Sequence, residues 1–71
     1  MITAEYLLGR LDYLRLAQED NQEKIEQLVE SGMLRGTELE MRLDLRNELI
    51  GRVAEIKYLY RQLVGEEAPV E

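Results

Sequence analysis

Apolar side chains recur along residues 4–31 at alternating spacings of three and four, the pattern of a helix packed in a coiled-coil seam. The seam positions are Ala4, Leu7, Leu11, Leu14, Gln18, Asn21, Ile25 and Leu28. Gln18 and Asn21 form a polar layer in the middle of this seam. Such a layer usually fixes register and oligomeric state at some cost in stability. The alternatives are a polar ligand site inside a helical bundle and, if the helix rotates, an Asn21 side chain that faces solvent.

A broader apolar set occupies residues 38–64. Its members are Leu39, Met41, Leu43, Leu45, Leu49, Ile50, Val53, Ala54, Ile56, Leu59, Tyr60, Leu63 and Val64. At 100° per residue they cover more than half of the helix circumference, whereas a helix on one neighbour needs a stripe of only about 100°. We therefore expect self-association. The predicted oligomer interface is Leu45, Leu49, Val53, Ile56, Leu59 and Leu63.

Capping signals divide the chain into two helices. Thr3 is a predicted N-cap, and Thr37 with Glu40 has the spacing of a capping box. Gly32 and Gly65 are predicted stop signals, because glycine readily takes the left-handed conformation that ends a helix. The predicted segments of a 1–65 domain are a helix over about 4–31, a loop over about 32–37 and a helix over about 38–64.

A loop this short forces an antiparallel helical hairpin. We predict an all-α fold in which two hairpins dimerise into a four-helix bundle. With a turn near Leu34, facing residues have numbers that sum to about 68, so Gln18 and Asn21 lie opposite Asn47 and Ile50.

The same register places Ala17 near Gly51 and Ala54. Glycine inside a helix costs about 0.5–1 kcal/mol relative to alanine, so Gly9 and Gly51 are candidates for close helix packing. Crossing by a second chain at this level and tolerated surface glycine are the alternatives.

Charge is distributed unevenly along a chain of 71 residues with a net charge of −6. Residues 1–18 are neutral and residues 49–65 carry +2, whereas residues 19–48 at the loop end carry −5. Two hairpins side by side in opposite directions bring unlike ends together, so we expect an antiparallel dimer. The acidic balance argues against binding nucleic acid or anionic lipid.

Side chains that carry chemistry are scarce, because the chain has no cysteine and no histidine. Ser31 is the only serine and has no histidine to activate it. Two acidic ridges could in principle hold Mg²⁺ or Ca²⁺, but we interpret them as solvated faces: Glu19, Glu23, Glu26 and Glu30, and Glu40, Asp44 and Glu48. We expect no catalytic, cofactor-binding or metal-binding residues and no enzyme activity.

Basic residues lie close to the apolar arc of the second helix, at Arg42, Arg46 and Lys57. We expect them to pair with acids, and an anion clamp built from two chains is the alternative. The sequence offers three pairs in the favourable i, i+4 order: Glu38–Arg42, Glu48–Arg52 and Asp20–Lys24.

The four tyrosines gather at the end that holds the termini. We interpret them as dimer packing, with a partner surface as the second interpretation: Tyr6, Tyr13, Tyr58 and Tyr60. Residues 66–71 form a short acidic segment with a proline, and we expect it to be disordered. No apolar run approaches the ~20 residues of a membrane span, no signal peptide is visible, and the expected location is cytoplasmic.

These features predict a small noncatalytic interaction module, an adaptor, regulator or assembly subunit, whose partners are a second copy of itself and another protein. An acidic inhibitor is the alternative, because regularly spaced carboxylates imitate nucleic acid and would occupy a basic site on a partner enzyme.

Overall fold

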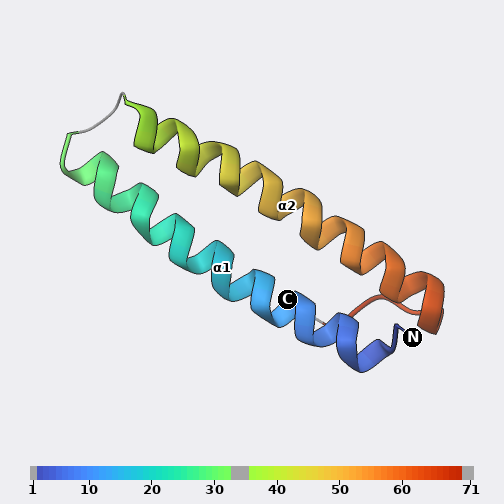
Figure 1. Ribbon diagram of the computed structural model, residues 1–71. Coiled ribbons are helices and arrows are strands. Elements are labelled where there is room, and N and C mark those ends of the chain that lie inside the picture. Colours follow the sequence, from blue (N-terminus) through green and yellow to red (C-terminus); the bar gives the residue numbers. More distant parts are fainter. Residues whose placement is uncertain (1, 33–35, 70–71) are drawn as a thin grey trace.

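The chain folds as an antiparallel helical hairpin (Figure 1). A computed structural model describes residues 2–32 and 36–69. Helix α1 (Ala4–Glu30) and helix α2 (Thr37–Val64) lie side by side, with the start of α1 and the end of α2 at the same end of the hairpin, and the described residues contain no strand. The predicted all-α hairpin is therefore confirmed. The predicted turn at Leu34 lies outside the described residues.

Helix α1 begins and ends at the predicted signals. The Tyr6 amide donates to the Thr3 hydroxyl at 3.1 Å, so Thr3 is the N-cap. At the other end, the Ser31 amide donates to the Gln27 carbonyl at 3.1 Å, and Gly32 follows with a φ of 81°. Glycine takes this left-handed conformation without steric cost, so the helix stops here.

The start of α2 differs from the predicted capping box. Thr37 is the first helical residue, and the N-cap is Gly36, whose φ of 139° is a glycine conformation. The Glu40 amide donates to the Gly36 carbonyl at 3.1 Å, which closes the first helical turn. The helix thus begins one residue earlier than the box requires, and the Thr37 side chain makes no cap. At the far end Gly65 is left-handed, as predicted, and its amide donates to the Arg61 carbonyl at 2.8 Å.

The core is one seam between the helices. All eight predicted seam positions of α1 are buried or half-buried. From α2, Leu49 and Tyr60 are buried, and five apolar side chains are half-buried: Leu39, Leu43, Leu45, Val53 and Ile56. The broad apolar arc of α2 is therefore only partly covered, because a single neighbouring helix contacts only one side of it.

The register differs from the expected one by several residues. Asn21 bonds to Arg42, whereas the predicted neighbour was Asn47. Ala17 shares a shallow hollow with Leu49 and Arg52 rather than with Ala54.

The two helical glycines lie on open surface. A Cβ atom built on Gly9 or Gly51 finds no atom within 4 Å. Close packing of α1 against α2 at these glycines is therefore wrong, and a second chain crossing there stays a prediction.

The segment after α2 turns back toward the helix. Glu67 and Ala68 line a hollow together with Ala54, Tyr58 and nearby basic residues of α2, and Ala68 is half-buried. Disorder over residues 66–71 stays a prediction, and residues 70–71 lie outside the described residues.

Replacing Gly9 or Gly51 by alanine should stabilise the fold. Each site is open and helical, so each substitution should raise the free energy of unfolding by about 0.5–1 kcal/mol, measured by urea denaturation. Gly65→Ala is the matched control: its φ of 84° strains an alanine, and the free energy should fall by about 1–2 kcal/mol. A loss of stability in Gly51→Ala would show that another surface covers this site.

Candidate interaction surface

The hairpin separates the four tyrosines. Tyr60 is buried in the core, whereas the other three are exposed. Tyr58 lines the hollow that also contains Ala68, and Tyr13 lines a different hollow between the helices. Tyr6 lies two helical turns before Tyr13 and so on the same side of α1. Tyr6 and Tyr13 therefore share one surface, and Tyr58 lines a different hollow.

The predicted interface residues of α2 also divide. Leu49 is buried against α1, and three others are half-buried in the same seam: Leu45, Val53 and Ile56. Leu59 and Leu63 stay 36% and 50% exposed. They line an apolar hollow with Ile2 and Leu7 at the terminal end of the hairpin.

Exposed apolar side chains outnumber buried ones. Among the described residues, six hydrophobic or aromatic side chains are buried, whereas eleven large ones are exposed. The exposed set is Ile2, Tyr6, Tyr13, Leu16, Val29, Met41, Ile50, Tyr58, Leu59, Leu63 and Val64. Single exposed apolar residues are ordinary, but a contiguous group on one side of a small protein is typical of an interaction surface.

Three of these side chains, Tyr6, Tyr13 and Leu59, lie along one side of the molecule. A hollow between the helices is lined by Arg10, Tyr13, Ala17 and Asp20 of α1 and by Leu45, Glu48 and Arg52 of α2, among others. Tyr6 continues the α1 row and Leu59 the α2 row, each at a spacing of seven residues. We call these nine residues the Tyr13 face.

The centre of the Tyr13 face is ordered by a cation–π contact. The Arg10 guanidinium carbon lies 5.3 Å from the centroid of the Tyr13 ring, a range in which the ring attracts the cation. Tyr13 itself is 61% exposed, so an aromatic ring flanked by a cation is presented to the outside. The sequence signal for this surface was the heptad spacing from Tyr6 to Tyr13, a second stripe beside the seam.

Asn21 carries the polar layer. Only 2% of it is exposed. Its side-chain nitrogen donates to the Arg42 carbonyl at 2.9 Å, and the Arg42 guanidinium donates to its oxygen at 3.3 Å. Both polar ends of the amide thus have a partner across the hairpin. This satisfied arrangement fits the structural interpretation of the layer, because Asn21 retains no unpaired group for a ligand. Gln18 is half-buried beside it.

Ion pairs on the surface follow the helix spacing. Lys24 lies 3.2 Å from Asp20, and Arg52 lies 2.8 Å from Glu48, as predicted. The predicted Glu38–Arg42 pair is wrong: Arg42 is hydrogen-bonded to Asn21, across the hairpin.

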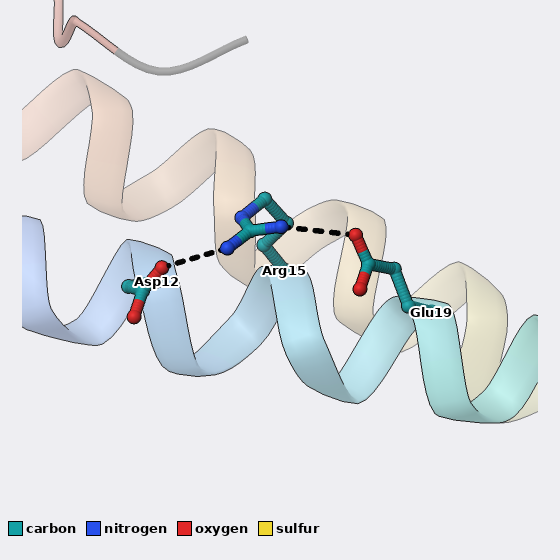
Figure 2. Close-up of polar contacts among 3 residues, drawn as sticks. All are labelled: Asp12, Arg15 and Glu19. Atoms are coloured by element: carbon teal, nitrogen blue, oxygen red, sulfur yellow. Dashed lines mark hydrogen bonds and ion pairs between the residues drawn. The ribbon is translucent and has the colours of Figure 1, made fainter.

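Arg15 bridges two carboxylates along α1, at 3.0 Å from Asp12 and 3.0 Å from Glu19 (Figure 2). The hydrogen bond to Asp12, and then the charge of Glu19, raise the pKa of Arg15. Arginine is already fully protonated at neutral pH. The stabilisation that this raised pKa gives the folded state is therefore present below the unfolded-state pKa of the arginine and is lost only at strongly alkaline pH. This bridge therefore adds no pH dependence near neutrality.

The acidic ridges carry little that indicates a metal site. Glu19 and Glu48 already pair with arginines. Within residues 2–32 and 36–69, no group of three or more metal-ligating side chains converges. Ser31 donates its hydroxyl hydrogen to the Leu28 carbonyl at 3.0 Å, so it supports the helix end.

Over the same described ranges, neither helix combines the length and apolar character needed to cross a membrane. Comparison with protein-family models, with curated proteins and with solved structures finds no match for this chain. Functional inference therefore depends on the surfaces themselves.

Two replacements of Asn21 should separate its effect on stability from its effect on the register of the two helices. Asn21→Ala leaves a cavity and an unpaired Arg42 guanidinium, and should lower the free energy of unfolding by about 1–3 kcal/mol. Asn21→Leu fills the space with apolar surface and should be closer to neutral in stability, while weakening the preference for one register. Urea denaturation measures the first effect, and the dispersion of amide NMR signals measures the second. Equal, large losses in both variants would contradict a register role.

Proposed function

We propose that this chain is a noncatalytic association module that acts as a homodimeric four-helix bundle and, in that form, binds another protein. The excess of exposed over buried large apolar side chains, eleven against six among the described residues, carries the proposal. Water penalises each exposed apolar surface, so a second helical surface on this group stabilises the molecule.

The dimensions of the hairpin agree with this proposal. Its radius of gyration is 14.8 Å, whereas a compact domain of 71 residues has about 11 Å. Its accessible surface of 5592 Å² exceeds by about 1000 Å² the value expected for a folded monomer of 8.3 kDa. A standard protein interface buries about 800 Å² per partner. The surplus of one chain is thus about one interface.

The small core supports the same proposal. One core in a chain of this size rarely supplies more than about 3–5 kcal/mol, and the chain has no cysteine for disulfides. Association remains as the source of further stability. The noncatalytic part of the proposal rests on the residues available, since the chain has no histidine or cysteine and Ser31 is bonded to its own helix end.

Self-association makes stability depend on concentration. We expect sedimentation equilibrium between about 1 and 100 µM to give twice the 8.3 kDa mass of one chain. The free energy of unfolding should rise by about 1.4 kcal/mol of dimer for each tenfold increase in concentration. A cooperatively folded chain that keeps the mass of one copy over this range would remove the basis of the proposal.

An acidic inhibitor is the second candidate, favoured by the loop half of α1. Glu23, Glu26 and Glu30 are exposed there, and none of the ion pairs of the described residues involves them. Carboxylates at this spacing present a row of negative charge to a basic partner.

This candidate makes a separate prediction. Partners captured from native lysate should elute below about 0.2–0.3 M salt, because exposed charges are screened over a Debye length of about 8 Å at 0.15 M. They should be lost from a Glu23→Gln, Glu26→Gln, Glu30→Gln variant and retained by Tyr13→Ser. The reverse pattern, loss only in Tyr13→Ser, would favour the association module.

A further inference from the structure

We infer that the occupant of the Tyr13 face is a second copy of this chain, seated antiparallel about a two-fold axis that passes beside residue 15 of α1 and residue 50 of α2. This inference rests on the proposed homodimer and specifies which face forms it and in which direction. Three observations carry it: the charge pattern of the face, the state of the opposite side and the polarity of the hairpin.

The charges of the Tyr13 face are self-complementary about one level of the molecule. Arg10 and Asp20 lie five residues before and after residue 15 of α1, and Glu48 and Arg52 lie two residues before and after residue 50 of α2. In an isologous contact, a residue that lies a given number of positions before the two-fold axis meets the residue that lies the same number after it in the other copy. The two-fold therefore places each Arg10 opposite Asp20 of the other copy, and each Arg52 opposite its Glu48.

The two centres lie at the same height in the hairpin. Asn21, six residues beyond residue 15, bonds Arg42, which is eight residues before residue 50. The centres thus agree within two residues, or about 3 Å along the axis. One two-fold axis can therefore relate both helices to those of the other copy. Two unrelated charge patterns would have no reason to be centred at the same height.

Apolar groups complete the contact. The same operation places Tyr13 opposite Ala17, a large ring against a small side chain, and Leu59 opposite Met41.

Tyr6 falls opposite Lys24, where an ammonium can lie over its ring. One pairing is unfavourable, because Leu45 falls opposite Glu55 at the edge.

The opposite side of the hairpin suits a second copy less well. There Glu67 and Ala68 lie with Ala54 and Tyr58, so the chain covers part of that surface itself. The other hollow of that side is lined by Glu19, Glu23 and Glu26 against the single base Arg46, together with uncharged residues. Two such surfaces facing each other would repel.

The uneven charge along the hairpin favours the antiparallel direction. The loop end carries −5 and the terminal end +2, counted over residues 19–48 and over 1–18 with 49–65. A parallel dimer sets the two −5 ends together, whereas the antiparallel dimer sets each beside a +2 end. Individual exposed pairs are weak, so the direction depends on the summed pattern.

Charge reversal at the paired positions tests the face. Arg10→Glu and Asp20→Arg should each weaken dimerisation about tenfold, because each turns two attractive contacts into repulsive ones. An equimolar mixture of the two variants should form a heterodimer, and the double variant should recover the homodimer, both read by native mass spectrometry. Glu26→Arg is the matched control, with the same charge change as Asp20→Arg but on the opposite side, and should not weaken dimerisation. Circular dichroism checks that every variant keeps its helices.

A single spin label tests the direction. The chain has no cysteine, so Gln62→Cys gives a unique labelling site on α2. In the antiparallel dimer the two labels lie 24 residues apart along the axis, or about 36 Å, whereas a parallel dimer brings them side by side at the same end. Double electron–electron resonance distinguishes these distances.

Each outcome has one meaning. A wild-type dimer that ignores both charge reversals, or whose variants do not recover on mixing, overturns the assigned face and leaves the homodimer standing. Labels at short distance overturn the antiparallel direction. A wild-type chain that stays monomeric overturns the proposed function and this inference with it.

Discussion

Helices α1 and α2 contact each other along a single seam, and a seam of this kind buries only one stripe of each helix. In α1 the stripe covers eight of the twelve apolar residues, which are buried or half-buried, and leaves Tyr6, Tyr13, Leu16 and Val29 exposed. In α2 the apolar set is wider than the stripe, so Met41, Ile50, Leu59 and Leu63 remain exposed. This mismatch between two helices is the constraint from which the surface properties of the hairpin follow, since each helix offers the other only about 100° of contact.

Asn21 gives the seam its specificity. An apolar seam of leucines tolerates sliding by a turn, because one leucine replaces another at little cost. A buried amide bonded to both the backbone and the guanidinium of Arg42 does not, since a shift leaves both groups unpaired. The bond therefore fixes the height at which the charges of α1 and α2 lie beside one another. The alignment of the two charge patterns on the Tyr13 face depends on that height, so a polar contact inside the hairpin determines the pattern outside it.

Local signals predicted the helix ends well where the cap depends on one residue. Thr3, Gly32 and Gly65 act as their chemistry requires. The Thr37 capping box failed, because Gly36 adopts a backbone conformation open to glycine and extends α2 by one residue. Sequence spacing cannot separate these alternatives, since threonine and glycine are accepted about equally at an N-cap position. The sequence likewise did not predict which tyrosines are buried, because residues close together in number, such as Tyr58 and Tyr60, point 200° apart on a helix.

The sequence by itself determined the two helices, their antiparallel arrangement and the excess of apolar surface, because periodicity and capping are local properties that a linear pattern records. Only the tertiary structure decided the register, the open surroundings of Gly9 and Gly51, and the separation of buried Leu49 and Tyr60 from exposed Tyr13 and Leu59. Those depend on the rotation and height of one helix against the other. A shift of a few residues changes which side chains are covered while it leaves the hydrophobic pattern of each helix unchanged.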